Sequence, residues 1–363
     1  MPYDLIEDCR MRFVGADGLR GIACLIVLIL HSFYFFFDGL NGFITGLPKI
    51  GVWLFFVLSA FLLTVKFETQ GFSTQALLVY MVGRVVRILP LYVLFVLVYW
   101  WLGTAGINSV DDLTRALMLG GTYAHLWTVP VEFKYYFFLP LVAFILITSK
   151  QRLGAVGCFS VGISLIIVEQ MLWPYWNAPT AGSEVKWYLS SFALGSLAAM
   201  FRSESVKWAS ARNSDVVVLA FLIVIVLISP YSRYRLLGLE PDQYLINKFL
   251  YLSALCAVLM LFVVHGQGII GRAVRSRPLR YIGYWSYPIY LVHWLIVVKL
   301  SSLYPGSLGA SFLAVMVSIL AGGIVHYALE VPLERFRRWS LARLSAPDFL
   351  ILISDRLPWR NRS

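Results

Sequence analysis

Long uncharged stretches divide the chain from near its start to near its end. Ten of them approach the roughly 17 to 25 residues that a helix needs to cross a bilayer. They begin near Gly21, Ile50, Ile88, Trp127, Leu153, Trp187, Val216, Phe249, Tyr281 and Leu308. This pattern predicts an all-α fold, a polytopic membrane helix bundle with about ten transmembrane helices. The sixth stretch is short, and Glu132 and Lys134 interrupt the fourth, so the predicted number holds to within one or two.

Basic residues lie mostly at one set of the predicted helix ends. Of the 30 Lys and Arg residues, 22 fall on the side that holds both termini and 8 fall on the other side. Because cytoplasmic loops carry the excess of Lys and Arg, this distribution predicts both termini in the cytoplasm. No internal repeat or linker separates a second domain. We therefore expect one membrane domain over residues 1–340, followed by a basic cytoplasmic tail over residues 341–363.

The composition fits a chain whose main solvent is lipid. Hydrophobic residues make up 60% of the sequence and charged residues 13%, about half the usual share of a soluble domain. The net charge of +11 arises from basic residues beside apolar stretches, which predicts membrane lipids and not nucleic acid as partners. The four cysteines show no paired spacing, so we expect no metal site and no disulfide framework. The sequence does not indicate an oligomeric state.

Arg20 and His31 belong to the same predicted first helix. Eleven residues amount to three turns plus about 20°, so both side chains share one face, roughly 16 Å apart along the axis. Imidazole suits proton transfer from a hydroxyl near neutral pH, and ionisable side chains inside a membrane are candidates for function. The same pattern also fits a cytoplasmic anchor at Arg20 and a packing residue at His31.

Other ionisable residues also fall at or inside the predicted membrane ends. Arg84 and Arg87 lie three residues apart, so their guanidinium groups suit a phosphate or pyrophosphate, although two topology anchors would show the same spacing. Glu132 lies one to two turns inside the fourth stretch and should face the bundle, beside an arginine or an imidazole. His293 lies in an aromatic-rich stretch that favours a structural role. Glu330 is placed to pair with nearby arginines at the cytoplasmic end.

Six segments together resemble the acyltransferase-3 family of integral membrane O-acyltransferases, which acylate bacterial surface polysaccharides and related glycans. In chain order they are Asp17-Gly-Leu-Arg20-Gly with His31, Phe55–Phe61, Arg84–Arg87, His125-Leu-Trp127 with Glu132, Tyr287–Trp294, and Glu330-Val-Pro332. Two positions depart from the family pattern. Ala60 replaces the usual Gly, and Phe133 replaces a frequent second acidic residue, which puts any mechanism with paired carboxylates there in doubt. Some members carry an appended esterase-like domain, which we do not expect in this chain.

The resemblance implies an acyl-coenzyme A donor on the cytoplasmic side, with acetyl as the usual acyl group, and no permanently bound cofactor. It implies an essential role for His31, and binding of the donor by Arg20, Arg84 and Arg87. Beside this we expect Glu132 to be catalytic, since it could tune the proton of His31 or stabilise the imidazolium. Supporting positions are then Asp17, Ser59, Trp127, Tyr287, His293 and Glu330. The expected acceptor is a hydroxyl of a cell-surface glycan, such as an exopolysaccharide or an O-antigen. The expected location is the bacterial inner membrane.

Several alternatives stay open at the level of sequence. A transporter or flippase for a glycan or a lipid-linked intermediate would also bury ionisable residues, but it predicts inverted repeats and broken helices that we do not find. A membrane acyltransferase of the lipid- or protein-modifying kind would place the chemistry at His293. A glycosyltransferase is less favoured, because the outer loops offer few acids beyond Asp111 and Asp112. Within the favoured reading, His31 is either a general base or a transient acyl carrier.

Overall fold

Every element in the described part of the chain is a helix. The computed structural model describes residues 14–240, 244–265 and 267–344. The first helices are α2 (Val14–Phe36), α3 (Asn41–Ile44), α4 (Pro48–Gln70), α5 (Thr74–Trp101), α6 (Val110–Leu117) and α7 (Thr128–Leu172). The later helices are α8 (Leu189–Met200), α9 (Arg202–Ser205), α10 (Ala211–Ile228), α11 (Pro230–Leu237), α12 (Phe249–Val263), α13 (Gly268–Val274), α14 (Arg277–Leu303), α15 (Leu308–Val325) and α16 (Val331–Leu344). A π-helical turn, η5 (His326–Glu330), joins the last two, and short 3₁₀ turns include η3 (Val185–Tyr188).

The lengths of these helices confirm a polytopic membrane bundle but reduce the number of spans. Seven helices of the described residues are long and apolar enough to cross a membrane, or eight if the bent pair α12 and α13 forms one span. This measure counts fewer spans than the predicted ten or so, because it leaves out short helices and merges others. One reason is that α8 has only 12 residues and α12 only 15, short of the roughly 20 that span the hydrocarbon.

A second reason lies in α7, which contains two of the predicted stretches. Its 45 residues are interrupted at Gly154, where φ is +70° and ψ is −169°, a conformation that glycine adopts without a steric penalty. Cys158 Sγ donates a hydrogen bond to the carbonyl oxygen of Leu146 at 3.5 Å. Residues 12 apart in a straight helix would be separated by about 18 Å, so the chain reverses at Gly154 and its two halves lie side by side.

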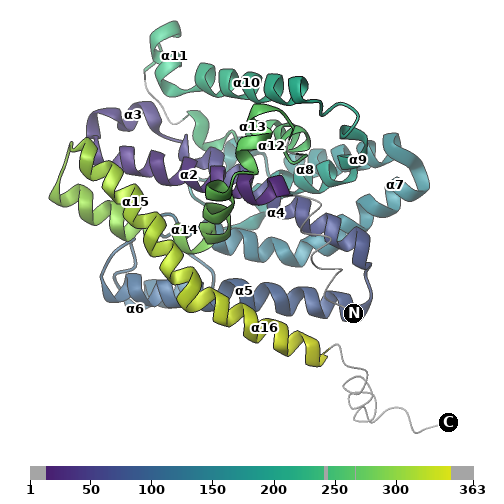
Figure 1. The fold of residues 1–363 in the computed structure, drawn as a ribbon, viewed down its shortest axis with the longest axis horizontal. Helices are drawn as coiled ribbons and strands as arrows, with labels where there is room; N and C mark the ends of the chain where they lie inside the picture. Colours follow the sequence, from purple (N-terminus) through teal and green to yellow (C-terminus); the bar gives the residue numbers. More distant parts are fainter. Residues whose placement is uncertain (1–13, 241–243, 266, 345–363) are drawn as a thin grey trace.

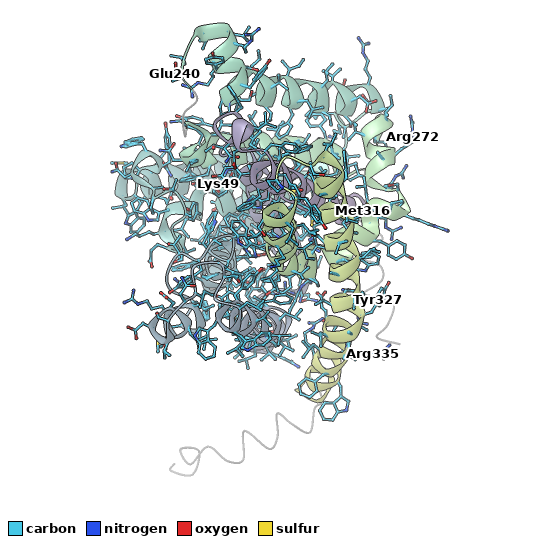
Figure 2. The ribbon with its side chains drawn as sticks, turned by 90° about the vertical axis from the view of Figure 1, so that its left-hand side faces the viewer. Lys49, Glu240, Arg272, Met316, Tyr327 and Arg335 are labelled. Atoms are coloured by element: carbon cyan, nitrogen blue, oxygen red, sulfur yellow. The ribbon has the colours of Figure 1, made fainter. Side chains whose placement is uncertain are left out.

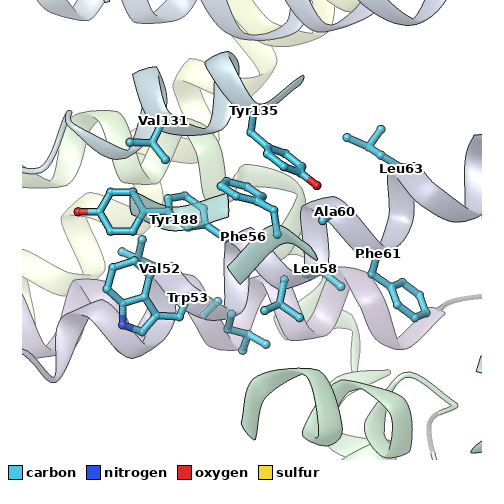
Figure 3. Close-up of a cluster of buried hydrophobic side chains, with 14 of the residues drawn as sticks. Val52, Trp53, Phe56, Leu58, Ala60, Phe61, Leu63, Val131, Tyr135 and Tyr188 are labelled. Carbon is cyan, nitrogen blue, oxygen red and sulfur yellow. The ribbon is translucent and has the colours of Figure 1, made fainter. Parts of the chain in front are cut away.

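Helix α4 forms the centre of the bundle and is buried along most of its length. Its aromatic side chains Trp53 and Phe56 pack against Tyr188 (Figure 3). The ring of Phe56 also stacks on that of Phe192 in α8, with centroids 4.5 Å apart. This packing joins α4 to the short helix α8. A 12-residue helix is therefore held inside the bundle by side-chain contacts, although it is too short to span a bilayer unaided.

Helices α2 and α14 approach each other closely because glycines face one another. A Cβ atom added at Gly283 would lie 1.8 Å from the carbonyl oxygen of Asp17 and 3.2 Å from the amide nitrogen of Gly21. His31 follows Gly21 by ten residues, and His293 follows Gly283 by ten residues. Because a helix rises about 1.5 Å per residue, equal spacing on two adjacent parallel helices brings both histidines to the same level.

The loops and short helices mark two ends of the bundle. In Figure 1 the long helices run across the view, with α3, α6 and α11 at the left-hand end and the reversal of α7 at the right-hand end. We call the first the pocket end and the second the arginine end, after the sites described below. The cytoplasmic location of the termini stays a prediction, as does the domain division at residue 340. Most of the predicted tail lies outside the described residues.

Candidate functional site

His31 of α2 and His293 of α14 form a hydrogen-bonded pair. The distance from Nδ1 of His31 to Nε2 of His293 is 3.1 Å, and the two rings stack with centroids 5.3 Å apart and planes 7° from parallel. His293 is buried, and its Nδ1 lies 2.8 Å from the backbone carbonyl oxygen of Tyr290. The sequence placed His293 only among supporting residues, yet the fold makes it the direct partner of His31.

This chain of contacts fixes where the protons lie when both rings are neutral. The carbonyl of Tyr290 can only accept a hydrogen bond, so Nδ1 of His293 must carry a proton. Nε2 of a neutral His293 is then an acceptor, and the proton between the rings belongs to Nδ1 of His31. Nε2 of His31 is left with a free lone pair. That nitrogen is therefore the basic atom of the pair.

A third histidine, His125, adjoins this pair. Its ring centroid lies 5.0 Å from that of His293, and it stacks on Trp294 at 5.1 Å. Burial, reinforced by the neighbouring His293 and His31, lowers the pKa of His125 well below its usual value, so its ring is neutral. Neither of its ring nitrogens makes a hydrogen bond of ordinary geometry, although the backbone carbonyls of Tyr290 and Leu291 are close. Among the described residues, no group of three potential ligands is placed to hold a metal ion.

Polar side chains continue from the histidines toward the arginine end. The hydroxyl of Tyr290 donates to the backbone carbonyl of His125 and accepts from Oγ1 of Thr128 at 2.8 Å. One turn further along α7, Oε1 of Glu132 accepts hydrogen bonds from Ser59 at 2.6 Å and from Tyr136 at 2.5 Å. We call this run of groups, from His31 to the arginines described next, the polar column.

Glu132 was expected to act on His31, but the structure does not bring the two side chains into contact. In the described residues the hydrogen bonds of Glu132 go to Ser59 and Tyr136, and the side-chain hydrogen bond of His31 goes to His293. Glu132, the acidic residue of this segment, thus belongs to the part of the polar column that is near the arginines. Any tuning of His31 by a hydrogen bond comes from His293.

The three predicted donor-binding arginines gather at the other end of the polar column. Arg20 and Arg84 both interact electrostatically with Arg87, and Arg20 also interacts with Glu132. Arg20 lies 3.9 Å from Asp17, and the guanidinium of Arg84 lies over the ring of Tyr136 at 5.6 Å. The Nε of Arg84 is buried and has no hydrogen-bond partner within the part of the chain that the structure describes. Three cations in one place favour a polyanionic ligand such as phosphate groups.

Two other predicted residues border this arginine cluster. Glu330, in η5, lies 2.7 Å from Nδ1 of His326 and interacts electrostatically with Arg87. The hydroxyl of Tyr287 donates to the backbone carbonyl of Ile88 at 2.8 Å. This hydrogen bond joins α14 to α5 directly after Arg87. Glu330 and Tyr287 thus border the arginine cluster, and their supporting roles stay predictions.

A pocket of about 320 Å³ opens beside His31 at the pocket end. Its lining includes His31, His125, Lys49, Trp127 and Trp294, so two of the histidines and one predicted supporting residue meet in it. No arginine lines it. The pocket therefore gives access to the histidines from one end of the bundle, and the arginines occupy the other end of the polar column.

The most informative residues that the sequence analysis passed over are His125, Tyr290 and Tyr136. Each one lies in or close to a segment that carries the family resemblance, but their partners come from elements far away in the chain. Tyr290 and His125 are 165 positions apart, and Ser59 and Tyr136 are 77 apart. The chain has five histidines in all. This scarcity was the feature of the sequence that could have indicated a role for His125.

Comparison with known proteins places this arrangement in a family. The sequence profile of the acyltransferase-3 family, described as an acyltransferase domain, matches residues 13–328. The chain is 26% identical to "Putative peptidoglycan O-acetyltransferase YrhL" of Bacillus subtilis (strain 168), over 78% of this chain and 48% of that protein. It is 23% identical to O-acetyltransferase OatA of Staphylococcus aureus (strain NCTC 8325 / PS 47), over 88% of this chain and 57% of that protein.

A third relative is similar to the same degree. The chain is 21% identical to "Putative O-acetyltransferase SACOL0978" of Staphylococcus aureus (strain COL), over 90% of this chain and 58% of that protein. The chain thus spans about half the length of the curated relatives that it matches. No solved structure matches it. Since the family profile covers most of the sequence, the chain belongs to the acyltransferase-3 family.

Proposed function

We propose that this chain is a membrane O-acyltransferase that moves an acyl group, acetyl by family resemblance, from acyl-coenzyme A to a hydroxyl of a glycan. The observation that carries the proposal is the position of His31, which lines the pocket at one end of a polar column that has three arginines at its other end. This arrangement offers a base for a hydroxyl and a cluster of cations for a phosphate-rich donor.

Arg20, Arg84 and Arg87 hold the phosphates of coenzyme A in this proposal. The Nε of Arg84, which has no partner among the described residues, and the repulsion of Arg87 with Arg20 and with Arg84 both favour an anion beside these side chains. The pantetheine arm then carries the thioester along the polar column toward His31. Because the pocket does not reach the arginines, side chains between the two sites, such as Tyr287 and Tyr290, must move when the donor binds.

The transfer step then needs one base and one leaving group. Nε2 of His31 takes the proton of the acceptor hydroxyl while the hydroxyl oxygen forms a bond to the acyl carbon. The bond from that carbon to sulfur breaks, and the thiolate takes up a proton and leaves as free coenzyme A. His293 keeps Nδ1 of His31 protonated and stabilises the imidazolium that forms. An acyl-histidine route would instead bond the acyl carbon to Nε2 first, with the same overall balance.

The acceptor proposed is a glycan of the bacterial cell envelope, and the proposed location is the inner membrane. Support comes from the relatives, one of which is named as a peptidoglycan O-acetyltransferase and another as the O-acetyltransferase OatA. An exopolysaccharide or O-antigen belongs to the same chemical class of acceptor. The bacterial origin of these relatives and the spans of the bundle agree with this location.

The test is acyl transfer by the purified protein in detergent, with acetyl-coenzyme A as donor and an oligosaccharide as acceptor. We expect release of thiol coupled to acylation of the sugar, and a rate at least about 100-fold lower for His31→Ala. His265→Ala is the matched control, because His265 contacts Ser205 away from the polar column. Undiminished transfer by a correctly inserted His31→Ala protein would contradict the proposal.

A further inference from the structure

The pocket beside His31 has a cation of its own, Lys49 at the start of α4. We propose that this pocket binds one sugar unit of the acceptor glycan and that the unit carries a negatively charged group, which Lys49 recognises. The inference rests on the proposed function, because it assigns the pocket to the acceptor. It adds the chemical class of that acceptor: an acidic or phosphorylated sugar.

The side chain of Lys49 is turned toward the pocket and is held there. Its Nζ donates to the backbone carbonyl of Thr180 and lies 3.5 Å from the carbonyl of Ile246, and it sits 5.4 Å from the centre of the Trp127 ring. Figure 2 looks onto the pocket end of the molecule, with Lys49 labelled. Two of the three ammonium protons are directed at carbonyl oxygens. The hydrogen bonds of the described residues therefore leave one ammonium proton for a further acceptor.

No carboxylate of the described chain neutralises this ammonium group. The ion pairs of the described residues leave Lys49 out, and its contacts are two neutral carbonyls and an aromatic face. Lys134, by comparison, also hydrogen-bonds a backbone carbonyl but has Glu184 3.9 Å away. A partly buried charge without a counterion is costly, so an anionic ligand is the natural complement of Lys49.

A lysine that only anchored the helix at the membrane surface would extend its amine into water. Lys49 instead bends over Trp127 and contacts residues from two other connections, Thr180 and Ile246. All of these residues line the pocket. The geometry therefore places the charge on the pocket wall and not on the outer surface.

The rest of the pocket suits a sugar ring. Its volume of about 320 Å³ lies at the small end of the usual range for ligand sites, roughly 300 to 1,000 Å³. The aromatic rings of Tyr34, Trp127 and Trp294 contribute to its wall and offer apolar faces for the C–H side of a sugar. His31 lies on the same wall, in edge contact with Trp294 at 5.4 Å. A sugar held by Lys49 thus presents a hydroxyl to the proposed base.

The experiment compares three acceptors of equal length with the purified protein and acetyl-coenzyme A. The first is an oligosaccharide that contains a hexuronic acid, the second is the same compound after reduction of its carboxyl groups, and the third is a phosphorylated analogue. We expect KM for at least one anionic acceptor to be about tenfold or more below that for the neutral compound, since a charge-assisted hydrogen bond is gained. The anion with the lower KM identifies the recognised group.

Two variants connect this preference to Lys49. In Lys49→Met we expect KM for the preferred anionic acceptor to rise about tenfold more than KM for the neutral acceptor, so that the preference for the anion is lost. Lys49→Arg keeps the positive charge and should keep a preference for the anion. Lys299→Met, on an exposed position of α14, should behave as wild type. Turnover of the neutral acceptor shows in each case that the variant protein is folded and that His31 is competent.

Two results would overturn the inference. One is a wild-type protein that does not distinguish the anionic from the neutral acceptors, and the other is a Lys49→Met protein that keeps the full preference. Failure of the proposed function would look different, because no acceptor would then be acylated by any variant. Binding of the three oligosaccharides to His31→Ala protein, measured by titration without turnover, decides whether the pocket recognises the anion in that case.

Discussion

His293 determines the tautomer of His31, because it accepts the hydrogen bond from Nδ1 of His31. A residue buried only for packing would not have this effect. Replacement by Leu removes the acceptor for Nδ1–H of His31, so the His31 ring is free to turn or to exchange its proton between nitrogens. We expect kcat to fall at least about tenfold. His293→Gln places an amide oxygen near the same position and should lose less than about tenfold.

The tautomer can be observed directly. In the ¹⁵N spectrum of histidine-labelled protein, His31 should show a protonated Nδ1 and an unprotonated Nε2 in the wild type and in His293→Gln. In His293→Leu the two nitrogens of His31 should give averaged signals. A His31 signal that is the same in all three proteins would mean that His293 serves packing alone.

Arg84 has the clearest predicted effect on the donor. Its Nε lacks a partner and its guanidinium covers Tyr136, so removal of the side chain takes away a cation that no described carboxylate pairs with at ion-pair distance. For Arg84→Ala we expect KM for acetyl-coenzyme A to rise about 10- to 100-fold, the value of one or two charge-assisted hydrogen bonds. Arg235→Ala, exposed on α11 at the pocket end, is the control. An unchanged KM in Arg84→Ala would mean that Arg84 is only a topology anchor and does not bind the donor.

At the scale of helices, the close contact between α2 and α14 holds the two histidines at one level. A methyl group at Gly283 would collide with the backbone of Asp17, so Gly283→Ala must push the helices apart. We expect a loss of about 1 to 3 kcal/mol in stability, seen as a lower midpoint of thermal unfolding in detergent, together with reduced transfer. Gly39→Ala, which has open space around its added Cβ, should leave both unchanged. Equal midpoints for the two variants would show that the contact does not limit stability.

At the scale of the whole molecule, the sequence predicted the helical class, the membrane location and the segments that meet at the site. Hydrophobic length was enough for the helical class and the membrane location, because it depends on local composition. The segments of the site were indicated by the family resemblance. Hydrophobic length could not show that α8 is held in place by contacts of Phe192 with α4, nor that the reversal between the stretches beginning near Trp127 and Leu153 takes place at Gly154 alone. Those features depend on packing and on one dihedral angle.

The residues of the site were predictable by type but not by partner. Arg20 and His31 could be placed on one face of a helix from their spacing. The pairing of His31 with His293 joins positions 262 apart, and it arises from glycine contacts whose register no local pattern contains. Glu132 was expected to face the bundle, beside an arginine or an imidazole, because a carboxylate this deep seldom faces lipid. Its hydrogen bonds go instead to Ser59 and Tyr136.

The most direct test of the account uses both ends of the polar column at once. The protein is reconstituted in vesicles with a single orientation, verified by protease access, with acetyl-coenzyme A on the side of the arginine end and the acceptor oligosaccharide on the other side. The account predicts acylated oligosaccharide only in this arrangement, and none with His31→Ala. Product that forms only when both substrates are on the same side, or equal product with His31→Ala, would contradict it.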